Sequence, residues 1–190
     1  PKKILEISEK LGVNVLGICD HNTTEGAIQT KKLAKNILVL VGQEIKTEYG
    51  DLCIFGTEEN LKGTLFEIVD RARYNELFIV FPHPFDRFRR AAMGNNLNKK
   101  DLMWLLKQID AIEVFNSRCV LNSANKKAQE VADEFKIPGI AASDAHTAGE
   151  LGNARNFLDC ELKEEEVYNA IRRNRVQWTG KRSALVNRIL

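Results

Sequence analysis

Short apolar runs alternate with amphipathic stretches along almost the whole chain. Compact apolar runs bounded by turn residues predict buried strands, whereas apolar residues at helical spacing predict helices packed on a core. Strands that alternate with helices indicate an α/β protein with a mainly parallel sheet, open or closed into a barrel. The predicted strands are 13–19, 37–41, 52–55, 77–81, 111–115, 139–142 and 176–179, and the predicted helices are 1–11, 24–36, 64–74, 99–107, 122–135 and 163–173.

Composition and charge narrow the class of protein. A chain of 190 residues with 44% hydrophobic residues is predicted to be one domain over residues 1–190. The net charge of +2 does not by itself indicate a nucleic-acid partner, and a local basic cluster follows at Arg87-Phe88-Arg89-Arg90. This cluster lies in segment 85–98, which is predicted to be an irregular loop, and loops of this length are often functional.

The cysteine spacing and the length of the apolar runs indicate in which cellular compartment the protein is expected. Cys19, Cys53, Cys119 and Cys160 are widely spaced, which favours neither a disulfide framework nor a zinc ribbon. Reduced thiols in a cytoplasmic protein are therefore expected. No apolar run reaches the roughly 18–20 residues of a membrane span, so no membrane partner is predicted.

The candidate chemistry lies where the predicted strands end. His21, His83 and His146 each follow an apolar run, and the chain has no other histidine. In a barrel of alternating strands and helices the site lies at the strand ends, so these side chains are expected to converge. The acidic and amide residues at other predicted strand ends are Asp20, Glu44, Glu113, Asn116 and Asp144.

Imidazole and carboxylate ligands together suit Zn, Mn, Fe or Mg. Asp144 and His146 are two residues apart on an extended segment, so both can reach one ion. A carboxylate such as Glu44 can bridge two ions, and two ions can clamp a phosphate and activate a water, which favours phosphate-ester hydrolysis. Each residue also has a structural alternative: a strand-end histidine can be a hydrogen-bonded core residue, and Asp20 can cap a helix. The arginines at 87 and 118 are either solvated loop charges or phosphate-binding groups.

Five short motifs occur in the order typical of the PHP (polymerase and histidinol phosphatase) family, and the chain resembles the stand-alone phosphoesterases of that family over nearly its whole length. The motifs are Cys19-Asp20-His21-Asn22-Thr23, Gly42-Gln43-Glu44-Ile45, Pro82-His83-Pro84-Phe85, Ile112-Glu113-Val114-Phe115-Asn116 and Ser143-Asp144-Ala145-His146. The resemblance implies a distorted (β/α)7 TIM-like barrel with two or three divalent metal ions at the strand ends.

The resemblance also implies roles for individual residues. The implied metal ligands are His21, Glu44, His83, Asp144 and His146, with Glu44 as the bridge. Asp20 would orient His21, and catalysis would depend on Asp20, Glu44 and Asp144. Asn116 and Arg118 would face the substrate phosphate. Arg87 is a further candidate for substrate binding, on the phosphate-recognition interpretation of its guanidinium and not from the resemblance.

Two departures from the family pattern stand out. Family members open with a strand that carries H-x-H, whereas this chain begins at the helix that follows it. We therefore expect an N-terminally truncated piece of a longer protein whose first strand is missing, and a natural loss of that strand is the alternative. Relatives also place a histidine on the strand after the bridging glutamate, where this chain offers Cys53 or Asp51 instead. An inert buried cysteine and a zinc-binding thiolate are both open at this point.

The predicted function is therefore hydrolysis of a small phosphomonoester or nucleotide through a metal-activated water. One alternative is exonuclease activity on short oligonucleotides, guided by the basic cluster that begins at Arg87. Another is a PHP-like scaffold or binding module that has lost catalysis. A scaffold has no need for acidic and imidazole residues at its strand ends, which favours the enzyme.

Overall fold

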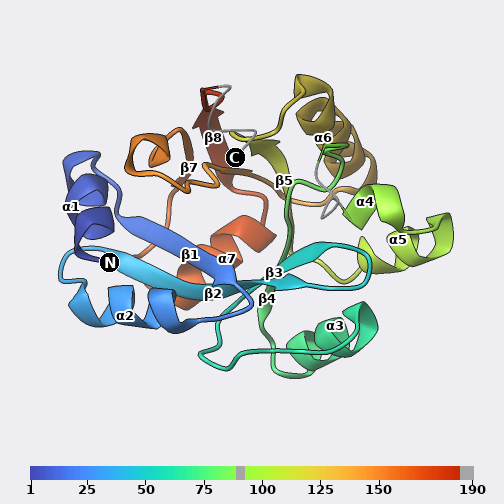
Figure 1. Ribbon diagram of the computed structural model, residues 1–190, viewed down its shortest axis with the longest axis horizontal. Helices are drawn as coiled ribbons and strands as arrows, with labels where there is room; N and C mark the ends of the chain where they lie inside the picture. The colour runs from blue at the N-terminus through green and yellow to red at the C-terminus, as the bar shows by residue number, and fades with distance from the viewer. Residues whose placement is uncertain (89–92, 185–190) are drawn as a thin grey trace.

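The computed structural model describes residues 1–88 and 93–184. Its helices and strands alternate as the sequence predicts (Figure 1). In chain order they are α1 Lys2–Lys10, β1 Val15–His21, α2 Glu25–Leu33, β2 Leu38–Lys46, β3 Asp51–Phe55, α3 Leu65–Tyr74, β4 Phe78–Phe81, α4 Met93–Asn96, α5 Lys99–Leu105, β5 Ala111–Asn116, α6 Asn122–Phe135, β6 Gly139–Ala142, the 3-10 turn η1 Ala148–Glu150, β7 Ala154–Leu158, α7 Glu164–Arg172 and β8 Val176–Gly180.

Three elements were not predicted. They are the short helix α4, which lies within the segment expected to be irregular, the 3-10 turn η1, and strand β7, which pairs antiparallel with β8 in a separate two-stranded sheet. The β7 sequence Ala-Arg-Asn-Phe-Leu does not stand out as an apolar run, because Arg155 and Asn156 interrupt it. Within the described ranges, no helix is both long enough and apolar enough to cross a bilayer.

The main sheet has six strands in the order β1-β2-β3-β4-β5-β6. Strand β2 is parallel to β1, and β5 is parallel to both β4 and β6, whereas β3 is antiparallel to β2 and to β4. The antiparallel pairs arise because a tight turn joins β2 to β3, with the Thr47 N–H donating to the Gly50 carbonyl at 2.7 Å. The α/β class is thus confirmed with a mixed sheet, and the (β/α)7 barrel that lacks a strand stays a prediction.

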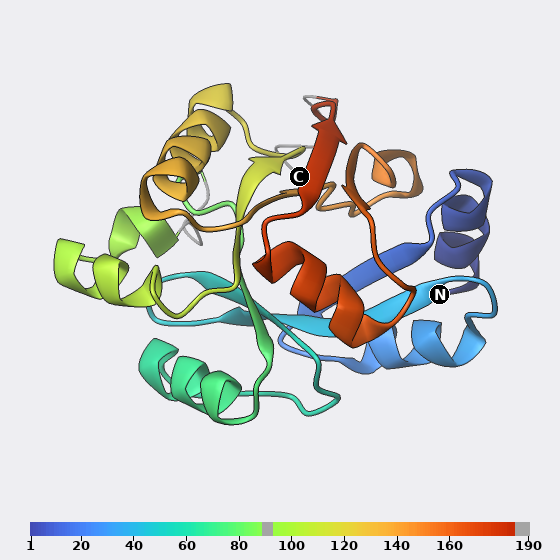
Figure 2. The ribbon, with the colours of Figure 1, turned by 180° about the vertical axis from the view of Figure 1, so that it is seen from behind.

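The sheet is curled, and α7 lies across its concave face (Figure 2). Val167, Tyr168 and Ile171 of α7 pack with sheet residues such as Phe78 and Val80 in one apolar cluster. The Phe78 and Tyr168 rings stack with centroids 4.6 Å apart. A helix near the C-terminus therefore fills the interior that the first five strands begin to enclose.

A buried ion pair joins α7 to the opposite side of the sheet. The Asp110 carboxylate accepts hydrogen bonds from Arg73 of α3, from Arg172 of α7 and from the Ile79 backbone. Helix α7 is thus fixed to α3 and β4, about 100 residues earlier in the chain, around one charge. Removing such a carboxylate leaves two arginines without their partner, which is destabilising where the charges are buried.

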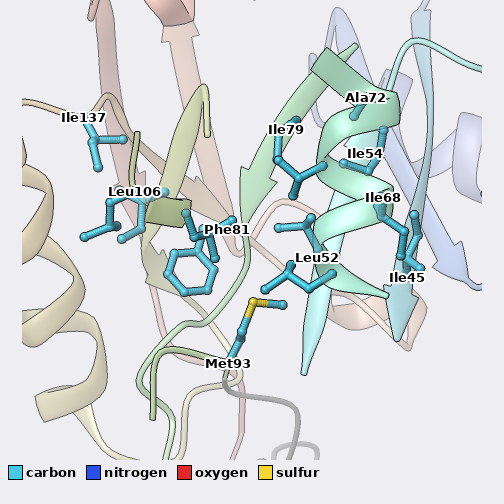
Figure 3. Packing of buried hydrophobic residues seen from close by; sticks show 14 of the residues in the cluster. Ile45, Leu52, Ile54, Ile68, Ala72, Ile79, Phe81, Met93, Leu106 and Ile137 are labelled. Atoms are coloured by element: carbon cyan, nitrogen blue, oxygen red, sulfur yellow. The ribbon is translucent and has the colours of Figure 1, made fainter. Parts of the chain in front are cut away.

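The larger core covers the outer face of the sheet (Figure 3). Successive side chains of β4 point to opposite faces of the sheet. Ile79 and Phe81 therefore enter this outer cluster, whereas Phe78 and Val80 face α7. Leu65, Ile68, Val69 and Ala72 of α3 and Ala128 and Ala132 of α6 complete it. The two clusters hold the strands rigidly between them, which fixes the side chains that project from the strands' carboxyl ends.

Gly42 of β2 lies where the sheet is most crowded beneath the polar end of the strands. A Cβ atom at this position would lie 2.5 Å from Cδ1 of Phe55 and 2.8 Å from Sγ of Cys19. We expect Gly42→Ala to lower the free energy of unfolding by about 1–3 kcal/mol, as overpacking does. Urea denaturation measures this change. Gly149→Ala is the matched control, because a Cβ there meets nothing within 4 Å, and an equal loss in both variants would contradict the packing argument.

Candidate metal centre

A row of side chains crosses the sheet at its polar end. The register pairs His21 of β1 with Glu44 of β2, and Glu44 with Cys53 of β3. Residues paired across neighbouring strands project from the same face, so these three side chains lie side by side. His21 and Glu44 belong to the strands themselves, whereas the sequence pattern predicted that they follow them. Their position within the hydrogen-bonded ladder restricts where their side chains can point.

The Glu44 carboxylate lies between two imidazoles. Its Oε1 is 3.0 Å from Nε2 of His83, and its Oε2 is 3.6 Å from Nδ1 of His21. The Glu44 residue is 8% exposed and His83 is 3% exposed, so this contact is largely shielded from solvent. Each carboxylate oxygen therefore faces a different histidine, which is the arrangement that a bridging ligand requires.

Asp51 at the start of β3 joins this group. One ligand atom from each of His21, Glu44 and Asp51 lies within 4.8 Å of the others, which is close enough for one ion to contact all three. Burial and the neighbouring Glu44 charge raise the pKa of Asp51. Carboxylates gathered in this way repel one another unless a cation neutralises them, so the donor set fits a divalent metal ion.

Cys53 is the other residue of β3 that the sequence suggested as a metal ligand. Its side chain is buried beneath the group of His21, Glu44 and Asp51. Its pKa is raised well above the ordinary thiol value by a hydrogen bond to Cys19 and by burial. Burial also raises the pKa of Cys19. The carboxylate of Asp51, which lies within ligand distance of His21 and Glu44, is the better candidate ligand on β3.

His83 is held by its own backbone as well as by Glu44. Its φ of +27° lies in the left-handed region, which non-glycine residues rarely adopt. Its N–H donates to Oε2 of Glu113 at 2.9 Å. Burial raises the pKa of Glu113, against the lowering effect of His83. Backbone strain of this kind recurs at functional sites, and here it turns the imidazole toward Glu44.

Asn116 connects this half of the centre to the C-terminal motif. Its Nδ2 donates to Oε2 of Glu113 at 2.9 Å and to Oδ2 of Asp144 at 3.2 Å, and its Oδ1 accepts from the Arg118 N–H at 2.9 Å. Both amide hydrogens are used in holding the two carboxylates. The contact with substrate predicted for Asn116 stays a prediction, and the structure gives this buried side chain a positioning contact instead.

Asp144 and His146 meet at the loop after β6. Asp144 has a φ of +49°, and Nδ1 of His146 lies 2.9 Å from the Asp144 carbonyl oxygen and 3.5 Å from its Oδ1. The ring centroids of His146 and His21 are 6.3 Å apart. The last motif in the sequence is thus brought to the first, as predicted from their strand-end positions.

Asp20 and Arg87 lie apart from this group. Asp20 precedes His21 on β1, so its side chain projects from the other face, where a Cβ added at Gly26 of α2 would overlap its Oδ2. In the part of the chain that the structure describes, it makes no hydrogen bond to His21. Arg87 is exposed on the loop after β4. Arg89 and Arg90 of the basic cluster lie outside the described residues.

Arg118 is buried, in contrast to the solvated alternative raised by the sequence. It is 5% exposed, and its Nε and Nη1 have no hydrogen-bond partner in residues 1–88 and 93–184. The nearby carboxylate is that of Glu150, whose Oε1 is 3.9 Å from the arginine Nε. Glu150 is a residue that the strand-end pattern misses, although the Thr147-x-x-Glu150 spacing is the signal of a capping box.

Parts of the chain match known sequences. Residues 122–176 match the family model for PHP-associated sequences. Two uncharacterized proteins of Methanocaldococcus jannaschii are related: MJ0417 is 39% identical over 74% of this chain and 56% of its own length, and MJ1587 is 33% identical over 62% of this chain and 66% of its own. The match thus spans less than two thirds of either relative.

Solved structures share the fold at low sequence identity. A two-domain protein of Bacteroides vulgatus, described as containing a predicted PHP-like metal-dependent phosphoesterase, superposes with a TM-score of 0.77 at 14% identity, over 98% of this chain and 64% of that one. A candidate metal-dependent phosphoesterase of Bifidobacterium adolescentis gives 0.61 at 14% identity, over 78% and 83%. The family-model match over residues 122–176 and the shared fold together support a PHP-family domain in this chain.

Proposed function

We propose that the protein is a metal-dependent phosphoesterase that hydrolyses a small phosphomonoester or nucleotide. The observation that carries this proposal is the Glu44 carboxylate, whose two oxygens face His83 and His21 separately. A buried carboxylate between two imidazoles, with Asp51 within ligand distance of His21, is a costly arrangement without a cation. The PHP-like phosphoesterases among the structural neighbours support the same reaction class.

The residues that would hold divalent ions are His21, Glu44, Asp51, His83, Asp144 and His146. Such ions, when bound, lower the pKa of a water nucleophile and neutralise charge on the phosphate oxygens. Two or three ions are expected, as in the family that the chain resembles. The protein's own contribution is to fix this donor set: Glu113 holds the His83 backbone, and Asn116 ties Glu113 to Asp144.

Arg118 is the group that we assign to the phosphate. Its guanidinium is buried, two of its nitrogen atoms have no hydrogen-bond partner among the described residues, and a forked donor of this kind matches phosphate oxygens. Its backbone N–H is held by Asn116, which also holds Asp144. The phosphate would thus be bound next to the metal ligands, where charge develops as the ester bond breaks.

Metal reconstitution tests the proposal. We expect the purified protein, after removal of metal with a chelator, to bind at least one Mn²⁺ or Zn²⁺ per chain in equilibrium dialysis. Hydrolysis of p-nitrophenyl phosphate should appear on addition of Mn²⁺ and disappear with excess chelator, because the ions supply the activated water. No bound metal, together with no hydrolysis at any added metal concentration, would favour the scaffold alternative.

The same assay separates the substrate classes. A nucleoside monophosphate and a short single-stranded oligonucleotide, offered at equal concentration, distinguish a phosphatase from an exonuclease. We expect the monophosphate to be preferred, since Arg118 is enclosed whereas Arg87 is exposed. A preference for the oligonucleotide that weakens steeply with salt would instead indicate backbone contacts by the basic cluster.

A further inference from the structure

Glu150 is a buried carboxylate that the proposed function does not use. It closes the 3-10 turn η1 and is 1% exposed. Its Oε2 accepts hydrogen bonds from three donors, the N–H of His146 at 3.1 Å and the N–H and hydroxyl of Thr147 at 3.0 and 3.1 Å. One carboxylate oxygen therefore fixes two consecutive backbone N–H groups, those of Thr147 and of His146, a predicted metal ligand.

A second capping box in the same chain shows what such a motif requires by itself. At the start of α3, Oε2 of Glu67 accepts from the N–H and the hydroxyl of Thr64 at 2.8 and 2.9 Å. Glu67 is exposed and has no arginine partner among the described residues. The motif therefore forms without burial, and the enclosure of Glu150 has a different cause.

The other oxygen of Glu150, Oε1, faces an arginine. The Arg118 Nε is 3.9 Å from Oε1, close enough for charge attraction and too far for a hydrogen bond. Nε and Nη1 of Arg118 are buried and have no hydrogen-bond partner within the described residues, so two of its donors stay unpaired beside Glu150. A positioned cation with unpaired donors is suited to an oxyanion.

The end of the described chain encloses this pair. Ser183 N–H donates to the Ser117 carbonyl at 2.8 Å, next to Arg118, and its hydroxyl accepts from Asn153 at 3.2 Å. The Asn153 N–H in turn donates to the Glu150 carbonyl at 3.0 Å. These contacts join the loop that bears Arg118 to the loop that bears Glu150, so the relative position of the two charged groups is fixed.

We propose that Glu150 is a positioning residue with two tasks: Oε2 fixes the loop that presents His146 to the metal, and Oε1 orients the Arg118 guanidinium toward the substrate phosphate. This inference rests on the proposed function and adds to it, because it couples metal binding and phosphate binding through one side chain. Neither task requires Glu150 to touch substrate. The two tasks are separable, since one depends on hydrogen-bond acceptance and the other on charge.

Glu150→Gln and Glu150→Ala separate the two tasks. In Glu150→Gln the amide oxygen can still accept from His146 and Thr147, but an NH2 group then faces Arg118 and repels it. We expect the metal affinity of this variant to stay within twofold of the parent protein, while its affinity for inorganic phosphate falls about tenfold, as outer-shell changes do. Glu150→Ala should weaken both. Calorimetric titration of the protein with Mn²⁺, and of the Mn²⁺-loaded protein with inorganic phosphate, measures the two constants.

Two further variants make the outcome decisive. Glu67→Gln, the same change in the exposed capping box, should leave both constants unchanged, and Arg118→Met should weaken phosphate binding with metal affinity retained. A phosphate affinity of Glu150→Gln within twofold of the parent, while Arg118→Met loses it, overturns the role of Glu150 and leaves the proposed function standing. If Arg118→Met also binds phosphate normally, the assignment of Arg118 to the phosphate and the role of Glu150 are both overturned, whereas failure of the proposed function would appear as no bound metal and no hydrolysis. Thermal melting of each variant identifies losses caused by unfolding, and a folded Glu150→Ala with normal metal affinity contradicts the first task.

Discussion

Replacing Glu44 with glutamine is expected to abolish metal-dependent hydrolysis, with kcat/KM falling by about 10³-fold or more, the loss typical of removing a central electrostatic group. The glutamine amide has a single oxygen. It therefore cannot place one acceptor oxygen toward His83 and another toward His21, as the carboxylate does. Metal affinity, measured by equilibrium dialysis, should fall in parallel. Both the metal affinity and the rate of hydrolysis are expected to fall, because the carboxylate joins the two halves of the proposed metal centre.

The fold of this variant should be unaffected or stabilised when metal is absent. Glu44 is 8% exposed and raises the pKa of its neighbour Asp51, so neutralising it removes repulsion between buried carboxylates. The melting temperature of the metal-free variant should therefore equal or exceed that of the parent, while the increase produced by metal disappears. Glu130→Gln, on the exposed face of α6, is the control. A Glu44→Gln protein with the parent's metal affinity would refute the assigned bridge.

Replacing Phe81 with alanine is expected to lower the free energy of unfolding by about 3–5 kcal/mol, the usual cost of emptying a buried aromatic site. Phe81 is fully buried between the sheet and its outer helices (Figure 3). Met93 and Leu106 lie in the same cluster and cannot fill the space without moving α4 and the end of α5. Urea or thermal denaturation of the metal-free protein measures the change.

Phe157→Ala supplies the matched control for this prediction. Phe157 of β7 is 55% exposed, so its truncation removes much less contact with neighbouring atoms and should cost under about 1 kcal/mol. Because Phe81 is two residues before His83, its loss should also reduce metal affinity as the loop loosens. An equal effect of the two substitutions on stability would contradict the assignment of the outer cluster as the main core.

Much of the candidate centre could be predicted from the sequence. Three histidines that follow apolar runs, with Glu44 and Asp144 at similar places, already indicated a convergent site. The structure brings Glu44 to His21 and His83, and Asp144 to His146. Strand ends are readable because apolar runs stop where the chain leaves the core. Their common location follows from chain topology alone.

Other features depend on contacts that no local pattern encodes. Whether Asp51 or Cys53 would join the centre depended on strand pairing, and the structure brings Asp51 within ligand distance while Cys53 contacts Cys19. The direction of β3 follows from the tight turn before it, which makes the sheet mixed. Asp20 faces α2 because neighbouring residues on a strand project to opposite sides.

The sequence by itself determined the α/β class, the order of the motifs and the chemical types of the candidate ligands, because these follow from local periodicity and residue identity. Only the tertiary structure decided that α7 fills the concave face, that Arg118 is buried and that Glu150 stands between it and His146. Such meetings join residues far apart along the chain. Their geometry is set by strand register and by the packing of the whole domain, which a local pattern does not contain.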